Sequence, residues 1–597
     1  MIASLARLIG RTSANYLYSI LYTRPDQLLW RVAERIRRGV VRARRPSSRP
    51  PRIRQPSAAL IERYGPLAAA RLTRPPGAWD AARPESLTFL SQGIPLGFPP
   101  RWDYISVDGK CADSHLWFFH LHYFDWIFDL LGARREDLAL MAMRSWIDRN
   151  RLGGPAGFLG PWHSYTISRR LPNWIAAYAT LERSGVLDRD SRRELLGSIA
   201  KQARFLSTHI EWEHRGNHLL ENLIALNIAD AFVGTGAKRR TRHERLLAKQ
   251  LEEQISPGGF HHEFSPMYHA ELLERLCDLL ILRRGDGSDL TRQLEDTVGR
   301  MAALLVFVLH PDGGLPLLGD SVLAPRDPGA RILEREDVRI APKPDSRGGT
   351  LRFGTRDGHV VFRDLEHGDF LIFDGAALGP DHLGAHMHAD LMGYELTLSG
   401  RRFISDGGGG IYVAGPSRRR LRAAREHAVL RVDSVECASP WKSFRMGRRG
   451  HPLELDASPL GPESFRIRGL HDGHAPAGVL HERVIEIDAS SRVYTITDTL
   501  VPIRGKEPAR PRRVECFLPL HRGMIVSREG PASFMIGASD HPHLARLQVE
   551  CGLPSLEVDV INGWQYEQFG IARERPVIRA TTMLRPGIPL VVRIQPL

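Results

Sequence analysis

Apolar residues follow two different spacings in the two halves of this chain. Between about residues 100 and 330 they recur every three or four positions, for example in 195–206, 219–232 and 270–282. That spacing predicts amphipathic helices. After about residue 350, short apolar runs are separated by turn residues, as in 360–362, 370–373, 427–432 and 493–497. Such runs are typical of strands in an antiparallel sheet. The pattern predicts an α+β protein, with helices first and strands later.

Length and turn residues divide the chain further. A chain of 597 residues is too long for a single hydrophobic core. We expect a basic N-terminal segment at 1–60, a helical domain at 61–345 and a strand domain at 346–597. Stretches rich in proline or charge at 46–51, 75–76 and 326–345 are the predicted linkers.

The overall charge points to an acidic partner. The chain has 82 Lys and Arg residues against 68 Asp and Glu residues, a formal net charge of +14. A polyanionic sugar, a nucleic acid or an anionic membrane would each fit this charge. The sequence has no recognisable nucleic-acid-binding module, which favours an acidic polysaccharide and no nucleic acid. The 5 Cys are scattered, which indicates neither a disulfide framework nor a cysteine-type zinc site.

The N-terminus does not have the pattern of a clean signal peptide. Arg7, Arg11 and Asn15 interrupt the apolar residues of 1–23. No stretch is long and apolar enough to span a bilayer. The arginine-rich region 30–54 fits either a solvated linker or a helix that makes peripheral contact with a membrane. The compartment is left open between the cell envelope or periplasm and the cytoplasmic side of the inner membrane.

A histidine motif lies near the centre of the strand half. Ala385-His386-Met387-His388-Ala389-Asp390 precedes the alternating residues Tyr394, Leu396 and Leu398, which predict a strand. If the motif enters that strand extended, His386, His388 and Asp390 point one way and Met387 the other. Imidazoles with a carboxylate suit zinc binding or general acid–base chemistry. A solvated histidine cluster is the simpler alternative.

The helical half contains aromatic clusters mixed with polar groups. The rings at 117–126 are most simply interpreted as core. A second cluster combines rings that can stack on sugars with an arginine that can pair with a carboxylate or sulfate. The residues that we expect to bind substrate are Trp162, Tyr165, Arg169, Asn173, Trp174 and Glu263.

Two further motifs lie at predicted helix starts. His218 and Glu221 share a helix face that Asn217 begins, so Glu221 can orient His218 or raise its pKa. A capped helix end is the alternative. The segment 258–269 is a loop that runs into a helix and places Tyr268 near the helix start.

Taken in order, these motifs resemble a known family. Asn217-His218 with Glu221, the segment 265–269, the histidine motif, Asp406 and His427 follow one another as in the heparinase II/III-like polysaccharide lyases, which include related alginate lyases. The resemblance implies an (α/α) toroid packed on an antiparallel β-sandwich, with a cleft between them. One departure is Met387, which stands where the family often has glycine between the two histidines.

The resemblance also implies roles in β-elimination. Asn217 and His218 would neutralise the uronate carboxylate, with Glu221 in support. Tyr268 would act as acid or as acid and base, and His386 as base; the sequence leaves the base open between them. A divalent metal, Zn²⁺ by donor type, would be structural and would be held by His388, Asp406 and His427.

Two other functions compete with a lyase. An (α/α)-toroid glycoside hydrolase would use two carboxylates, with Glu221, Glu263 and Asp320 as candidates, but it leaves Tyr268 and His386 without a role. A non-catalytic polysaccharide-binding or assembly protein of the cell envelope is the second alternative. The polymer is open among heparin-like glycosaminoglycans, alginate and bacterial exopolysaccharides, and we expect exopolysaccharide processing.

Overall fold

The computed structural model describes residues 10–43, 55–72, 77–103, 114–153, 160–234, 236–323, 332, 351–505 and 507–597. The linkers predicted at 46–51 and 75–76, and all but residue 332 of the one at 326–345, lie outside the described residues.

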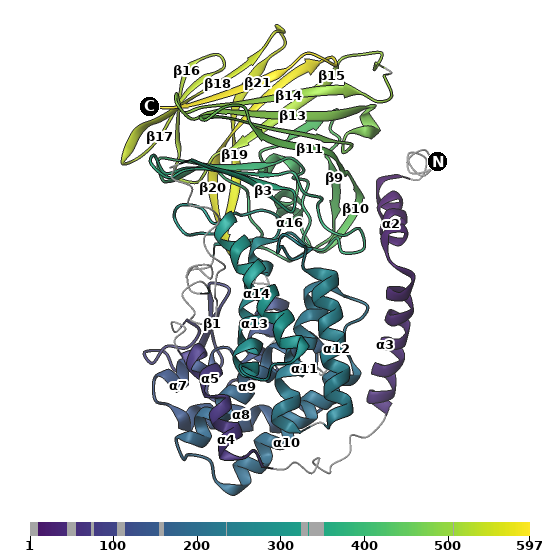
Figure 1. Cartoon of the computed structure of the whole chain (residues 1–597), viewed down its shortest axis with the longest axis vertical. Helices are drawn as coiled ribbons and strands as arrows, with labels where there is room; N and C mark the ends of the chain where they lie inside the picture. Colours follow the sequence, from purple (N-terminus) through teal and green to yellow (C-terminus); the bar gives the residue numbers. More distant parts are fainter. Residues whose placement is uncertain are drawn as a thin grey trace.

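Helices form the N-terminal half of the chain and the lower part of Figure 1, as the apolar spacing predicted. After the N-terminal helices α2 (Gly10–Tyr22) and α3 (Pro25–Ala43) they are α4 (Ala58–Arg63), α5 (Gly65–Leu72), α6 (Ser114–Tyr123), α7 (Ile127–Gly132), α8 (Glu136–Arg149), α9 (Ser164–Arg183), α10 (Arg189–Thr208), α11 (Gly216–Val233), α12 (Ala237–Gln254), α13 (Pro266–Arg283) and α14 (Asp289–Val308). A small hairpin of β1 (Ser86–Phe89) and β2 (Gln92–Pro95) lies among them. None of the described helices is long and apolar enough to cross a membrane.

Local sequence explains where these helices begin. Asp188, Ser265 and Ser288 precede α10, α13 and α14, and each side chain accepts a hydrogen bond from a backbone N–H of the first turn. Pro266 then occupies the first turn of α13, where a missing N–H costs nothing. Helix α11 packs against α9, α10, α12 and α13. Its burial on all sides explains why it is apolar almost all round.

The C-terminal half consists of antiparallel sheets, as predicted. One has five strands in the order β3 (Leu351–Arg356), β4 (His359–Asp364), β5 (Asp369–Asp374), β6 (Tyr394–Leu398) and β7 (Arg401–Ile404). One has eight strands in the order β11 (Pro452–Pro459), β12 (Ser464–His471), β13 (Val479–Asp488), β14 (Val493–Pro502), β21 (Leu590–Pro596), β18 (His541–Cys551), β17 (Ser533–Ala538) and β16 (Ile525–Gly530). One has four strands in the order β19 (Glu557–Gln568), β20 (Ile571–Leu584), β15 (Arg512–Pro519) and β8 (Leu430–Val432), and β9 (Ala438–Trp441) pairs with β10 (Arg445–Arg449).

These larger sheets share one hydrophobic core. Phe362 of β4, Ile485 of β13 and Ile578 of β20 belong to the same buried cluster. The strand predicted at 427–432 is shorter than expected. Strand β8 begins only at Leu430, because a 3₁₀ turn at Ala424–Glu426 precedes it and His427 lies between the two.

Polar contacts join the helical half to the sheets. The Asp357 carboxylate accepts hydrogen bonds from the Ser256 hydroxyl at 2.5 Å and from the backbone N–H of Phe260 at 3.1 Å. Farther along, His310 contacts Glu395 of β6 at 2.7 Å. The turn between β3 and β4 is therefore fixed to the segment that follows α12, and strand β6 is fixed to the segment that follows α14.

Helices α2 and α3 run along the outside of both halves (Figure 1, purple). On α2, the ring of Tyr16 meets that of Trp441 edge-on, with centroids 4.6 Å apart. On α3, Gln27 donates a hydrogen bond to the backbone carbonyl of Glu213, and Trp30 stacks on Trp212 at 6.0 Å. The basic N-terminal segment is therefore helical over 25–43, where the sequence also allowed a solvated linker.

Candidate active site and metal centre

The histidine motif lies in a loop, so the prediction that it enters strand β6 extended is wrong. Pairing of β6 with β5 begins at Tyr394, four residues after Asp390. His386 and His388 nevertheless reach the same partner, while Met387 packs into a separate apolar cluster with Leu391 and Met446. The expectation that Met387 faces away from the two histidines is therefore confirmed.

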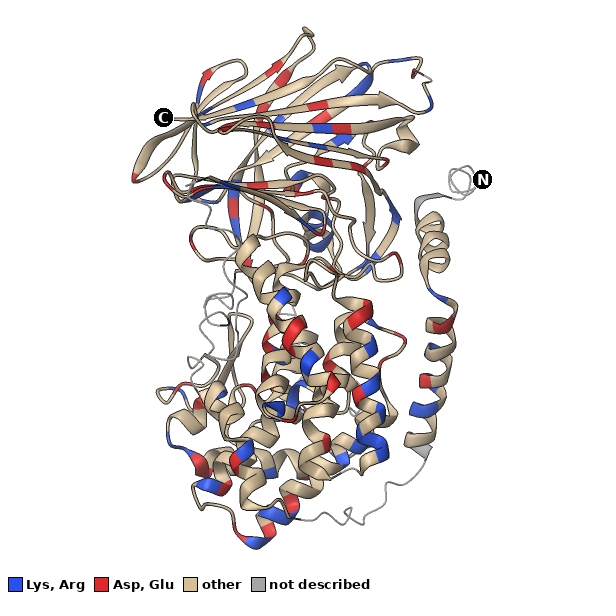
Figure 2. Cartoon of the chain, viewed as in Figure 1, with Lys and Arg blue, Asp and Glu red and all other residues tan. Residues whose placement is uncertain are grey.

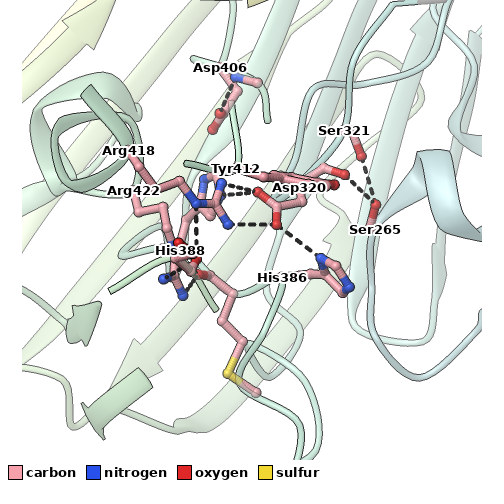
Figure 3. A network of polar contacts seen from close by, with 12 residues as sticks. Ser265, Asp320, Ser321, His386, His388, Asp406, Tyr412, Arg418 and Arg422 are labelled. Carbon is pink, nitrogen blue, oxygen red and sulfur yellow. Dashed lines mark hydrogen bonds and ion pairs between the residues drawn. The ribbon is translucent and has the colours of Figure 1, made fainter. Parts of the chain in front are cut away.

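That shared partner is Asp320, which the sequence offered only as a hydrolase candidate. His386 Nδ1 lies 2.9 Å from Asp320 Oδ2, and His388 Nε2 lies 2.9 Å from Asp320 Oδ1 (Figure 3). The Arg418 guanidinium donates hydrogen bonds to both oxygens of the same carboxylate, with Nη2 at 2.7 Å from Oδ2. Burial opposes ionisation of this carboxyl, but Arg418 and the two histidines hold its pKa well below the usual range. Asp320 is thus a buried anion that orients two imidazoles.

The same loop is fixed to the start of α13. Ser265 Oγ donates a hydrogen bond to the Asp320 carbonyl at 2.9 Å, and Ser321 Oγ accepts one from the backbone N–H of Met267 at 3.2 Å. This contact places Tyr268 beside the histidine motif, with its ring centroid 4.1 Å from that of His386. Tyr268 from the helical half and His386 from the sheet half are therefore in direct contact.

Tyr268 has a second tyrosine as a partner. Its hydroxyl lies 2.8 Å from the Tyr412 hydroxyl. Burial is the main cause that raises the pKa of both phenols well above 10. Both tyrosines are therefore neutral and carry a proton, which suits a general acid better than a base.

Glu263 connects the motifs of the two halves. Its Oε1 accepts a hydrogen bond from the Asn217 backbone N–H at 2.7 Å, and its Oε2 lies 3.2 Å from His386 Nε2. Gly216, whose φ is 51°, leaves room for this carboxylate, because a Cβ there would collide with Glu263. None of the described residues hydrogen-bonds the side-chain amide of Asn217. Asn217, Glu263, His386 and Tyr268 form one contiguous group.

His218 completes the group, but its partner differs from the predicted one. His218 Nδ1 lies 3.0 Å from Glu211 Oε1, and the ring stacks on Tyr165 at 4.2 Å. Burial lowers the pKa of His218, but the charge and hydrogen bond of Glu211 outweigh it, so the net shift is upward. The side chain is 34% exposed, so a cationic imidazole can meet a substrate anion.

Glu221 does not orient His218. It points to α9, where its Oε1 lies 3.0 Å from Arg169 Nη1, and Glu271 lies 3.3 Å from the same nitrogen. Spacing along α11 could place Glu221 on the face of His218, but it could not show that Arg169 competes for the carboxylate. The charge of Arg169 is likewise already balanced within the protein.

Three of the residues predicted to bind substrate are structural. Trp162 and Trp174 are 2% and 0% exposed and belong to the helical core. Asn173 is buried and donates hydrogen bonds to the Tyr123 carbonyl and the Asp125 carboxylate. Their burial argues against these predictions: Asn173 and Trp174 lie on α9, which is packed on nearly every side, and Trp162 is buried just before that helix. Only Tyr165, half-buried against His218, keeps a ring at the site.

The buried donors near His388 fit a metal ion. His388 Nδ1 and His427 Nε2 are buried and have no hydrogen-bond partner among the described residues. With Asp390 they form a set whose ligand atoms lie within 4.8 Å of one another. Two imidazoles and a carboxylate are a donor set that Zn²⁺ accepts. The predicted set named Asp406 in place of Asp390.

Asp406 has a different position. Its Oδ2 lies 2.6 Å from His427 Nδ1, on the opposite side of the ring from the unpaired Nε2. Burial lowers the pKa of His427, but the charge and hydrogen bond of Asp406 outweigh burial, so the net pKa rises to about 9. For the neighbouring Asp390, burial raises the pKa to about 7. Asp406 orients His427 and Asp320 orients His388, as carboxylates commonly do around metal-binding histidines.

A second histidine cluster supports this loop from the sheets. His471 donates to His481, which contacts Asp498 at 2.8 Å, and Asp498 pairs with Arg483. Arg483 in turn donates to the backbone carbonyls of Met392 at 2.7 Å and Ala428 at 2.6 Å. All ring nitrogens of His471 and His481 have hydrogen-bond partners. The cluster therefore stabilises the backbone on either side of the site, at Met392 and Ala428.

The fold and the site together define the class of protein. Helices are followed by antiparallel sheets. Where the two halves join, Asn217, His218 and Tyr268 of the helical half lie near His386 of the sheet half, beside the possible metal ligands His388, Asp390 and His427. The chain belongs to the heparinase II/III-like family. The model of the heparinase II/III N-terminus matches residues 138–340, and that of the heparinase II/III-like C-terminal domain matches residues 348–592.

Individual relatives agree with this assignment. The chain is 23% identical over 299 residues to a heparin-sulfate lyase of Pedobacter heparinus, a match that covers 46% of this chain and 44% of the relative. It is 21% identical over 364 residues to a heparin-sulfate lyase of Bacteroides thetaiotaomicron, with 54% and 51% covered. The chain thus spans about half the length of the curated relatives it matches.

Solved structures extend the similarity over nearly the whole fold. A crystal structure of heparinase III has a TM-score of 0.67 at 14% identity and covers 94% of this chain and 88% of that chain. A mutant of heparan sulfate lyase HepC from Pedobacter heparinus has a TM-score of 0.58 at 16% identity, with 94% and 87% covered. At these identities the likeness establishes the arrangement of helices and sheets.

Proposed function

We propose that this protein is a polysaccharide lyase that cleaves a uronic-acid-containing acidic polysaccharide by β-elimination. The observation that carries the proposal is the pairing of a neutral Tyr268 with His386, whose ring Asp320 orients. We also propose that the helices form an (α/α) toroid and that the stacked sheets form a sandwich. The packing of α11 among its neighbours and the core shared by the sheets support that description.

The chemistry requires a base and an acid close together. When the uronate C5–H takes the place of Glu263 Oε2 beside His386 Nε2, that nitrogen takes the proton, while Asp320 holds Nδ1–H and stabilises the imidazolium that forms. The C5–H electron pair forms the C4–C5 double bond, and the C4–O bond breaks. Tyr268 donates its proton to the departing oxygen. We assign the base to His386 because burial keeps the phenol protonated.

The substrate carboxylate must be neutralised before C5 becomes acidic. His218 supplies a positive charge, since Glu211 favours its protonated form, and Asn217 supplies an amide that has no hydrogen-bond partner among the described residues. Tyr165 offers a ring beside them for stacking on the sugar. Arg169 contributes indirectly, by holding Glu221 and Glu271 away from the substrate.

The metal that the family implies would be held by His388, His427 and Asp390. Bound there, a divalent ion would fix the loop that carries His386, and its role is structural. Asp406 orients His427 from outside the ligand set. Metal analysis of purified protein distinguishes the two acidic residues. Asp390→Asn removes a ligand and abolishes binding, whereas Asp406→Asn weakens affinity by about 10- to 100-fold. The reverse order would restore Asp406 as the ligand.

The carboxylates argue against a hydrolase. Hydrolysis needs one protonated and one free carboxylate on either side of the bond. Asp320 is held ionised by Arg418, and Glu221 is paired with Arg169. Glu263 contacts Asn217 and His386. No pair of the three is left for that mechanism.

A panel of uronate polymers tests the proposal. Elimination produces an unsaturated uronyl end that absorbs near ~232 nm, as expected when the C5 proton is removed. Heparin-like glycosaminoglycans, alginate and bacterial exopolysaccharides should be included, and we expect activity in exopolysaccharide processing. Reducing ends without the absorbance would identify a hydrolase. Binding without any product would identify an envelope binding or assembly protein.

A further inference from the structure

The outer face of helix α3 is apolar and uncovered. Leu29, Val32 and Ile36 are 72%, 56% and 62% exposed, and Leu28 and Val40 are exposed beside them. We call these five residues the apolar stripe. They recur at three- and four-residue spacing and therefore form one continuous band along the helix. Exposed apolar residues in such a band mark an interaction surface more often than scattered ones do.

The opposite face of α3 packs against the protein and fixes the position of the helix. Gln27 and Glu34 are buried, and Trp30 stacks on Trp212. Arg24, just before the helix, pairs with Glu253 at 2.9 Å. Because these contacts fix the inner face of α3, the apolar stripe faces away from the protein.

Positive charge surrounds the stripe. Arg31 and Arg35 are exposed on α3, along one edge of the band. The neighbouring helix α12, whose Glu253 pairs with Arg24, has further exposed cations (Figure 2, blue): Lys238, Arg239, Arg240, Arg242, Arg245 and Lys249. An apolar band edged by arginine is the pattern of a helix that lies in a membrane interface.

We propose that α3 docks this protein on an anionic phospholipid surface, with the apolar stripe inserted among the acyl chains and the arginines on the headgroups. An acidic polysaccharide would meet the charge but is too hydrated to cover the leucine, valine and isoleucine side chains. A second copy of the chain would cover the stripe but would bring the two rows of arginine together. A lipid surface satisfies both features.

Vesicle co-sedimentation of the full chain tests this docking. We expect binding to vesicles of phosphatidylglycerol and phosphatidylcholine, little binding to phosphatidylcholine alone, and weakening with salt. Leu29→Ser/Val32→Ser/Ile36→Ser should lower the partition coefficient on the order of 100-fold. Arg31→Gln/Arg35→Gln should lower it by about fivefold for each charge. The matched control is Leu453→Ser/Leu460→Ser, two exposed leucines of the sheet half, which should change nothing.

Several outcomes would overturn the docking. One is failure of the wild type to bind anionic vesicles, and another is binding that the stripe variant retains. If light scattering shows a dimer that the stripe variant dissociates, the surface belongs to a second copy. If only binding of an acidic polysaccharide weakens, the surface is a sugar site. Thermal melting of each variant checks folding, because the exposed stripe contributes little to the core.

Discussion

Replacing Asp320 by Asn tests the centre of the site most directly. The substitution keeps the shape but removes the charge that holds Arg418, a side chain with 0% exposure. Arg418 then keeps its hydrogen bond from Nε to the Ser443 carbonyl at 3.0 Å and one from Nη1 to the neutral amide oxygen, but its buried charge has no anion. Leaving such a charge costs about 3–5 kcal/mol. For a domain of this size that corresponds to a fall of about 6–20 °C in melting temperature.

The same change should disable the base. An asparagine NH₂ facing His386 Nδ1 favours the tautomer with its proton on Nε2, which cannot accept the C5 proton. We expect elimination to fall on the order of 10²- to 10⁴-fold at temperatures where the variant is folded. Calorimetry measures the first effect, and product absorbance on the active polymer measures the second.

Two further variants separate charge from chemistry. Asp320→Asn/Arg418→Met removes both charges and should regain part of the stability but none of the activity. Asp369→Asn is the matched control, since Asp369 of β5 is buried and paired with Arg492 at 2.7 Å in the sheet half. It should lose stability and keep its turnover. A melting temperature of Asp320→Asn within about 2 °C of wild type would refute the buried-charge reasoning.

Other perturbations address individual groups. Tyr268→Phe should reduce the elimination rate on the order of 10²-fold or more with folding intact. Tyr412→Phe should reduce the rate less, and equal losses in the two variants would contradict the assignment of Tyr268 as the general acid. Glu211→Gln removes the group that raises the pKa of His218, so the pH at which KM rises should move downward, and an unchanged profile would exclude a cationic His218 from binding. For the wild type, the His218–Glu211 contribution to stability is present below the ordinary pKa of histidine and is lost as pH rises through the raised pKa. His388→Ala should lose bound metal and thermal stability together; loss of metal with unchanged melting would mean that the ion is not structural.

Periodicity predicted the architecture but not the orienting groups. The helix spacing at 195–206, 219–232 and 270–282 and the strand at 394–398 match α10, α11, α13 and β6, because the apolar residues of each segment recur with the period of its element. Glu211, Arg418 and Asp320 had no such signal. Their roles depend on loops and helices that meet only in the folded chain.

The errors have similar causes. Trp162 and Trp174 were expected to stack on sugar rings, but both side chains are buried in the helical half. The sequence alone does not distinguish an exposed tryptophan from a buried one. The resemblance implied Asp406 as a metal ligand, whereas in the fold the Asp406 carboxylate lies against His427 Nδ1 and Asp390 lies with His388 and His427. Ordered motifs identified the family, and geometry was needed to identify which carboxylate orients which histidine.

Helices α2 and α3 also have a mechanical consequence. They form a rod that is fastened at Tyr16 and Ser19 to β9 and β10, and at Gln27 and Trp30 to the helical half. Any hinge motion that separates the sheets from the helices has to bend this rod at its one break, between Tyr22 and Pro25. The two helices therefore link the sheets to the helical half beside the junction where, in the proposed lyase, the polymer would enter.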